Sequence, residues 1–257
     1  MGDWVHNLPI WAMALVVFGV TYLVACGILA IVLALAKGER VRIFTGVSPA
    51  LLSPLGVLFG LMVVFIAAQV WGDIDRARTA VNREASAIRM VALLAPAFPG
   101  DSETRLRGLI RRHVDEAVSS EWPDMARQSA SLKVAAPALS EGLQLTLALE
   151  PKRQGQILAQ REIVAGLENA MDARRQRIIA SRSSVNWIKW NCLFGMAICM
   201  LIAAAMVHCN NRGAAALAVG IFATGVAVSV LLILSHDRPF SGAISVKPDV
   251  LQQARPD

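Results

Sequence analysis

The fold is decided by residues 51–95, which read LLSPLGVLFGLMVVFIAAQVWGDIDRARTAVNREASAIRMVALLA. The first part of this stretch is apolar and uncharged, which is typical of a helix that crosses the hydrocarbon core of a bilayer. The second part is rich in charge, yet Ala77, Val81 and Ala85 keep apolar residues at helical spacing. We therefore predict one long helix that crosses a membrane and continues beyond it.

Three further stretches of the chain are also long, apolar and uncharged. The four spans predicted in this way lie near residues 11–35, 51–71, 190–208 and 214–235. The chain as a whole is 55% hydrophobic and 17% charged, whereas a soluble domain has about 45–50% apolar and about 25% charged residues. This composition excludes a disordered chain and a disulfide-stapled mini-protein.

The segment 73–189 has a different composition, because it holds 18 of the 25 Lys and Arg and 14 of the 19 Asp and Glu. Apolar residues recur there at helical spacing, and no alternating strand pattern appears. We expect a helix capped by Asp101 or Ser102, a helix break at Trp122-Pro123, and a helix near 137–149. A last helix from about residue 154 is expected to run into the third span.

The predicted fold class is all-α, with four transmembrane helices and an antiparallel helical soluble domain inserted between the second and the third. The predicted domains are residues 1–72 with two spans, 73–189 as the helical domain, 190–238 with two spans, and 239–257 as a short tail.

Basic residues near the span ends predict the orientation. Four spans place both termini and the helical domain on one side, which carries Arg76, Arg78, Arg83, Arg89, Arg174, Arg175, Arg177, Arg182, Lys189, Arg238, Lys247 and Arg255. The other side carries only Lys37, Arg40, Arg42 and Arg212. The positive-inside rule then predicts a bacterial inner-membrane protein with its termini and helical domain in the cytoplasm. The first span alone favours the reverse orientation, because Lys and Arg follow it and none precedes it.

No catalytic signature is found in the sequence. The four cysteines lack CxxC or Cys/His metal spacing, and no Gly-rich phosphate loop, GxSxG elbow or HExxH motif occurs. His113, in Arg111-Arg112-His113, is interpreted as a surface group. We expect no enzyme, no metal site, no cofactor and no nucleic-acid partner.

The spans contain no Asp, Glu, Lys or Arg in their interiors, although proton-coupled pumps and transporters usually carry such groups. The functional classes that remain are a channel, a sensor and an assembly module. Arginines at 76, 78, 174, 175 and 177 could raise the anion concentration at a pore mouth, and they are equally explained as ordinary positive-inside flanks.

Three short motifs stand out in the chain, namely Glu84-Ala85, Glu121-Trp122-Pro123 and Asp237-Arg238-Pro239-Phe240-Ser241-Gly242. With these motifs the chain resembles the bestrophin-like family of bacterial membrane proteins. The resemblance covers nearly the whole chain, and it assigns no role to Glu84, Glu121, Trp122, Asp237, Arg238, Pro239, Phe240 or Gly242. From the residues alone, Pro239 would end the fourth helix, Phe240 would anchor at the membrane interface, and Gly242 would permit a turn.

The layout is also similar to that of true bestrophins, which are pentameric anion channels with four membrane helices per subunit. This similarity implies a homo-oligomer, a pentamer in that case, that passes chloride or another small anion. It places Ser53, Val57 and Leu61 on the neck of the pore, although the small polar Ser53 departs from the bulky pattern of that family. The tail lacks the acidic calcium clasp of animal bestrophins, so no calcium gating is expected.

Two functional hypotheses follow. In the first, Val57 and Leu61 form an apolar constriction, and Arg76 and Arg78 favour anions. In the second, the protein is a non-conducting membrane module whose helical domain senses or docks a partner. Burial of the Ser53, Val57 and Leu61 face against the protein's own bundle would favour the second.

Overall fold

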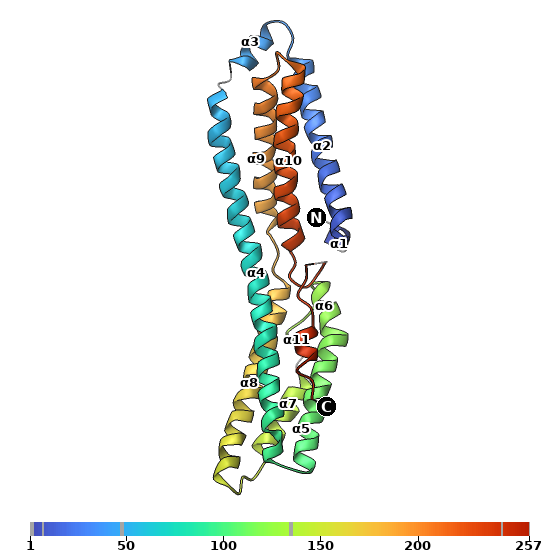
Figure 1. Cartoon of the computed structure of the whole chain (residues 1–257), viewed down its shortest axis with the longest axis vertical. Coiled ribbons are helices and arrows are strands. Elements are labelled where there is room, and N and C mark those ends of the chain that lie inside the picture. The colour runs from blue at the N-terminus through green and yellow to red at the C-terminus, as the bar shows by residue number, and fades with distance from the viewer. Residues whose placement is uncertain (1–2, 7, 47–48, 134–135, 243, 257) are drawn as a thin grey trace. The chain divides into compact units, whose positions relative to one another are not determined.

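A computed structural model describes residues 3–6, 8–46, 49–133, 136–242 and 244–256 of the 257-residue chain. The described residues form helices and turns and no strand (Figure 1), so the predicted all-α fold is confirmed. The chain divides into two compact units, each assembled from segments far apart in sequence. Unit 1 comprises Met1–Trp71 and Ser184–Asp237, and unit 2 comprises Gly72–Ser183 and Arg238–Asp257.

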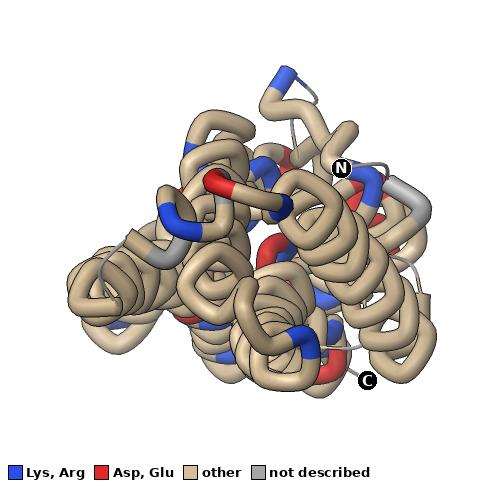
Figure 2. The backbone as a smooth tube through the Cα atoms, turned by 90° about the horizontal axis from the view of Figure 1, so that it is seen from above, with Lys and Arg blue, Asp and Glu red and all other residues tan. Residues whose placement is uncertain are grey.

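Among the residues that the structure describes, four helices are long and apolar enough to cross a membrane. They are α2 (Ile10–Leu35), α4 (Leu52–Leu94), α9 (Trp187–Val207) and α10 (Arg212–His236). Figure 2 colours Lys, Arg, Asp and Glu, and the coils of the apolar stretches are tan along their lengths. The four predicted spans therefore correspond to four helices, and α4 continues for more than twenty residues beyond its apolar part, as predicted.

Unit 1 also contains the short helices α1 (Asp3–His6) and α3 (Glu39–Thr45) and a 3-10 turn (Pro49–Leu51). One hydrophobic cluster brings Phe59 and Ile66 of α4 together with Leu193 of α9 and Ile233 of α10. In a second cluster, small residues such as Ala204 let α2, α9 and α10 approach one another closely.

Unit 2 is built from the charged part of α4 and the helices that pack on it. These are α5 (Asp101–Glu116), a π-helical turn (Ala117–Glu121), α6 (Trp122–Ala126), α7 (Pro137–Leu147), α8 (Gln154–Ser181) and α11 (Asp249–Gln252). Ile88, Ile110 and Leu167 lie in their shared core and are almost fully buried. After α4 the chain turns through a 3-10 segment (Ala95–Ala97) that contains Pro96, as expected from the prolines there.

Two predicted helix boundaries are wrong. Trp122-Pro123 does not break the helix, because the π-helical turn before it widens the backbone and Pro123 then lies in the first turn of α6. The helix from residue 154 does not run into the third span. It ends at Ser181, and the Asn186 side chain caps a new helix by accepting a hydrogen bond from the Ile188 backbone at 3.1 Å.

The start of α5 also differs from the prediction. Gly100, with φ +96°, is the N-cap in place of Asp101 or Ser102, because only glycine adopts this backbone conformation easily. Asp101 and Glu103 instead lie in the first turn, where their charge interacts favourably with the helix dipole.

The C-terminal residues belong to the core of unit 2. Phe240, Val246 and Leu251 are buried in the same hydrophobic cluster as α4, α5 and α8. Gly242 has φ +83° and makes the predicted turn, after which the Val246 backbone N–H donates to the Pro239 carbonyl at 2.7 Å. The prediction that Phe240 anchors at the membrane interface is wrong, because its ring is 4% exposed and packs inside unit 2.

Candidate functional site

Five polar side chains meet inside unit 2, and we call them the buried charge cluster. They are Glu84 of α4, His113 of α5, Glu121 of the π-helical turn, and Arg174 and Arg177 of α8. Helical spacing puts Arg174 and Arg177 on one side of α8, three residues apart. Three parts of the chain that are distant in sequence, namely α4, α5 with its π-helical turn, and α8, are thus joined by polar side chains.

The Arg177 guanidinium is the centre of this cluster. Its Nε donates to Glu84 Oε2 at 2.7 Å and its Nη2 to Glu84 Oε1 at 3.0 Å, a bidentate pair. The same Nη2 donates to Glu121 Oε2 at 2.8 Å, while Arg174 Nε donates to Glu121 Oε1 at 2.7 Å. His113 Nε2 lies 2.9 Å from Glu84 Oε1. Two carboxylates therefore alternate with two guanidinium groups, and the charges balance.

Burial and pairing act in opposite directions on these groups. Glu84 and Arg177 are both fully buried, which by itself raises the pKa of the carboxyl and lowers that of the guanidinium. The charge and hydrogen bonds of Arg177, with the hydrogen bond from His113, outweigh burial and lower the pKa of Glu84. Glu84 and Glu121 likewise raise the pKa of Arg177. Both groups are held in their charged forms.

Aromatic and apolar residues enclose the cluster. The Arg177 guanidinium carbon lies 4.9 Å from the centroid of the Trp122 ring, a cation–π contact. Trp122 Nε1 donates to the Val246 carbonyl at 3.2 Å, and the Phe240 ring meets the Trp122 ring edge-on at 5.6 Å. Glu84, Glu121, Trp122 and Phe240, which come from all three motifs singled out in the sequence, therefore lie together.

Several sequence-based interpretations of these residues are wrong. His113 is 2% exposed and faces Glu84, so it is not a surface group. Arg174 and Arg177 are buried and paired, so they cannot attract anions to a pore mouth. The arrangement resembles a structural core more than a reaction centre, because each of its charges is balanced by a fixed partner.

The Asp237 carboxylate lies outside the buried charge cluster and makes contacts within unit 1. Its Oδ1 accepts a hydrogen bond from the Val185 backbone N–H at 2.7 Å, and its Oδ2 lies 3.8 Å from His6 Nε2. The carboxylate therefore ties the end of α10 to the segment before α9 and to the N-terminal helix. The Arg238 carbonyl accepts a hydrogen bond from the Ser241 backbone N–H at 3.3 Å, which closes the turn after α10.

The pore-lining candidates lie on an open face of α4. Ser53 is exposed, and Val57 and Leu61 are 58% and 61% exposed, whereas Phe59 and Ile66 face the bundle and are buried. The unit 1 bundle therefore does not cover the Ser53, Val57 and Leu61 face.

Arg76 and Arg78, the two anion-attracting candidates, differ in their ion pairing. The Arg76 side chain is largely exposed, and its guanidinium pairs with the buried Asp73 carboxylate one turn away. Arg78 is exposed on the same helix. Arg78 is therefore the better candidate for a charge available to a passing anion.

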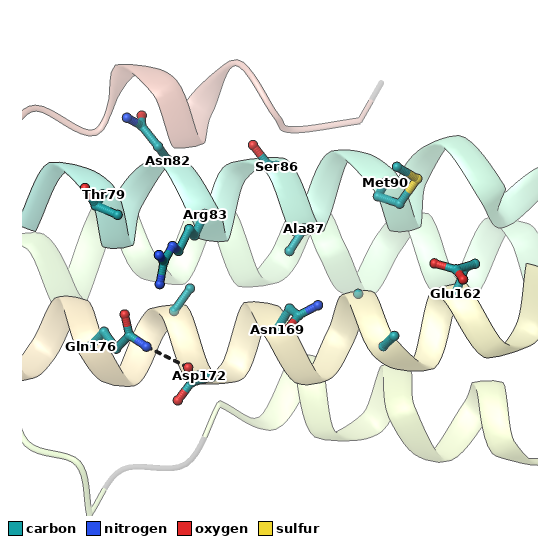
Figure 3. A pocket seen from close by; sticks show the side chains of 13 residues that line it. Thr79, Asn82, Arg83, Ser86, Ala87, Met90, Glu162, Asn169, Asp172 and Gln176 are labelled. Carbon is teal, nitrogen blue, oxygen red and sulfur yellow. Dashed lines mark hydrogen bonds between the residues drawn. The ribbon is translucent and has the colours of Figure 1, made fainter. Parts of the chain in front are cut away.

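A groove of about 680 Å³ runs between α4 and α8 of unit 2 (Figure 3). Its lining includes Thr79, Asn82, Arg83, Ser86, Glu162, Asn169, Asp172 and Gln176. Gln176 Nε2 donates to Asp172 Oδ2 at 2.7 Å along one wall. Sequence reasoning missed this groove, because it arises from the antiparallel packing of two helices about ninety residues apart in the chain.

The four apolar helices and the helical unit that continues from one of them define a polytopic membrane protein. A family model for the bestrophin-like domain matches residues 19–251, nearly the whole chain. The chain therefore belongs to the bestrophin-like family, as the sequence motifs predicted. Comparison with curated proteins and with solved structures finds no significant match.

Proposed function

We propose that this bestrophin-like membrane protein forms an oligomeric anion channel in which α4 lines the pore. Val57 and Leu61 make the constriction, and Ser53 lies one turn before them. The observation that carries this proposal is the exposure of all three residues on one face of α4. Burial of that face within a single chain would have left no surface to line a pore.

An apolar constriction suits a chain without charges inside its spans. A ring of Val and Leu side chains can gate ions by dewetting, so no buried charge is needed. The exposed Arg78 then concentrates anions at the mouth of the pore, and Arg76 contributes less because its charge is shared with Asp73. The proposed activity is passive flux of chloride or a similar small anion, and no catalytic step is involved.

Chloride flux from liposomes that contain the purified protein tests this proposal, with native mass spectrometry to give the subunit number. We expect a homo-oligomer that conducts, and faster flux for Val57→Ala and Leu61→Ala, which widen the constriction. Leu58→Ala is the matched control, because Leu58 is 55% exposed but lies about 100° away from Val57 around the helix. A monomer without flux would overturn the proposal.

The orientation is part of the same proposal: unit 2 lies in the cytoplasm of a bacterial cell. The excess of basic residues on that side of the spans supports this orientation. A membrane-impermeant maleimide should leave Lys133→Cys unlabelled in intact cells and label Asn210→Cys, in a background without the four native cysteines. Both positions are exposed. Labelling of Lys133→Cys in intact cells would overturn this orientation and place unit 2 outside the cytoplasm.

The α4–α8 groove favours a second candidate, a non-conducting module whose helical unit docks a partner. Its lining combines amide, hydroxyl and charged side chains of both signs with apolar ones such as Met90, which suits a protein surface of mixed polarity. A photo-crosslinker placed at Ser86 would report such a partner in cells. Docking of a partner would be the favoured function if the protein were a monomer and gave no chloride flux in liposomes.

A further inference from the structure

The exposed charges on the two helices that border the α4–α8 groove differ in sign. Along residues 79–90, the exposed charged side chains of α4 are Arg83 and Arg89. Along residues 162–176, α8 exposes three carboxylates and one arginine, which are Glu162, Glu168, Asp172 and Arg175. In this part of unit 2 the α4 side is therefore basic, and the α8 side is mainly acidic.

These six charges make no ion pair within the described part of the chain. The charged side chains of α5 differ, because each has a partner in the same chain, as Arg107 has Glu103 at 3.1 Å. On α8, Glu168 and Asp172 lie one turn apart with the same sign, which is unfavourable in an isolated helix. A partner with cationic groups would relieve this repulsion.

Arg89 and Glu168 lie at the same height on opposite edges of the α4–α8 pair. The two helices touch where Gly166 meets Val91, since a Cβ atom on Gly166 would lie 2.7 Å from Val91 Cγ2. Each charged residue is two positions from its contact residue, so it points about 160° away from the neighbouring helix. Because the helices are antiparallel, both steps lead toward the same end of the pair. Arg89 and Glu168 of one chain therefore point away from each other.

We propose that these two edges of unit 2 form a contact between copies of this chain, in which Arg89 of one copy pairs with Glu168 of the next. A rotation about an axis parallel to α4 and α8 keeps each residue at its height, so it brings the basic edge of one copy to the acidic edge of its neighbour. Such a head-to-tail contact closes into a ring, in which every copy uses both edges. Charge complementarity favours a second copy as the occupant, because one chain carries both halves of the contact.

This inference rests on the homo-oligomer of the proposed function and names the surface that joins its subunits. It does not require that the oligomer conducts ions. The contact and the channel can therefore be tested separately.

Crosslinking between two differently tagged full-length copies tests the position of the contact. One copy carries Arg89→Cys and the other Glu168→Cys, in a background without the four native cysteines, and a short bismaleimide is added to membranes that contain both. We expect a crosslinked pair of the two tags with a yield about fivefold or more above that of Lys133→Cys with Glu168→Cys, because paired edges hold the thiols at a high effective concentration. Lys133 is exposed and lies outside α4 and α8.

Charge reversal tests the pairing itself. Arg89→Glu and Glu168→Arg should each raise the dissociation constant of the oligomer by about threefold or more, because like charges then face each other. The double variant Arg89→Glu with Glu168→Arg should restore the wild-type value, since the pair re-forms with exchanged signs. Native mass spectrometry over a dilution series measures the subunit number. Glu150→Arg is the control, because it reverses an exposed carboxylate outside these helices and should change nothing.

The outcomes separate this contact from the proposed channel. An oligomer in which either test fails overturns the contact and leaves the channel intact. An oligomer that passes both tests but gives no chloride flux keeps the contact and overturns the channel. Crosslinks from Glu168→Cys to a different protein, in place of a second copy, overturn the contact and favour the docking function. A monomer overturns both the contact and the channel.

Discussion

At the residue scale, Glu84 is the side chain that organises unit 2. A fully buried carboxylate is costly unless it is paired and hydrogen-bonded, and Glu84 receives two hydrogen bonds from Arg177 and lies against His113. Glu121 holds the other side of Arg177 and also holds Arg174. Removal of Glu84 therefore deprives the buried Arg177 charge of its bidentate partner, which costs more than the net stabilisation by the pair.

Glu84→Gln should strongly destabilise unit 2, because Arg177 then keeps its buried charge and loses its bidentate partner. We expect a loss of about 3–5 kcal/mol in the free energy of unfolding, or a thermal midpoint lower by about 10 °C. Circular dichroism melting of the detergent-solubilised protein measures this effect. Glu150→Gln, at an exposed position, should change the stability by less than about 0.5 kcal/mol. Equal midpoints for the two variants would contradict the structural role of the cluster.

The lowered pKa of Glu84 predicts a pH dependence of stability. The unfolded chain takes up a proton at this carboxyl near the ordinary value of 4.5, and the folded protein does so only at lower pH. The stabilisation is therefore complete above about pH 4.5 and is lost as the pH falls below it toward the folded pKa. The difference in melting temperature between wild type and Glu84→Gln should stay constant from pH 7 to pH 5 and shrink on further acidification. A constant difference down to pH 3 would refute this assignment.

At the element scale, the closeness of α4 and α8 in unit 2 depends on a glycine. A Cβ atom added at Gly166 would lie 2.7 Å from Val91 Cγ2 and 3.4 Å from the Ala87 carbonyl oxygen. Valine is stiff at χ1, so it cannot easily move away. The two helices therefore pack at a distance that only glycine allows, and this packing brings Arg177 within reach of Glu84.

Gly166→Ala should destabilise the protein by about 1–3 kcal/mol, because the added methyl group forces α8 away from α4. The double variant Gly166→Ala with Val91→Ala should recover part of the loss. Gly108→Ala in α5 is the matched control, because a Cβ atom there meets nothing within 4 Å. That change should stabilise the protein by about 0.5–1 kcal/mol through helix propensity. Thermal melting of the four proteins gives the comparison, and stabilisation by Gly166→Ala would disprove the close approach.

At the scale of the whole molecule, each compact unit is discontinuous in sequence. The C-terminal residues complete the core of unit 2 although a long stretch of unit 1 separates them from the rest of it. Phe240 contacts Trp122, and Val246 accepts the Trp122 indole hydrogen bond through its carbonyl. The motif after the fourth span therefore acts as a structural part of unit 2.

Phe240→Ala should destabilise unit 2 by about 3–5 kcal/mol, because it opens a cavity beside Trp122 and loosens the C-terminal segment. The control Val250→Ala lies in the same segment at a position 39% exposed, and it should have an effect below about 0.5 kcal/mol. Limited proteolysis should remove the C-terminal segment faster in Phe240→Ala than in the control. Equal cleavage rates would show that the segment is not held by this ring.

The sequence by itself determined the four spans, the all-α class, the long α4 and the family. These features follow from local patterns, because lipid requires uninterrupted apolar helices and a helix repeats its faces every 3.6 residues. The same periodicity placed Ser53, Val57 and Leu61 on one side of α4, whereas the exposure of that side came only from the structure. The family motifs were also visible in the sequence, although their roles were not.

Only the tertiary structure decided what the charged and aromatic motif residues do. Hydropathy alone predicts Arg177, His113 and Glu84 to be surface residues, because polar and charged side chains are rarely buried without a partner. Their burial depends on partners that lie 29 and 93 residues apart along the chain, and no local pattern encodes such pairing. The same holds for Phe240 and for the α4–α8 groove, since both arise where distant segments pack against one another.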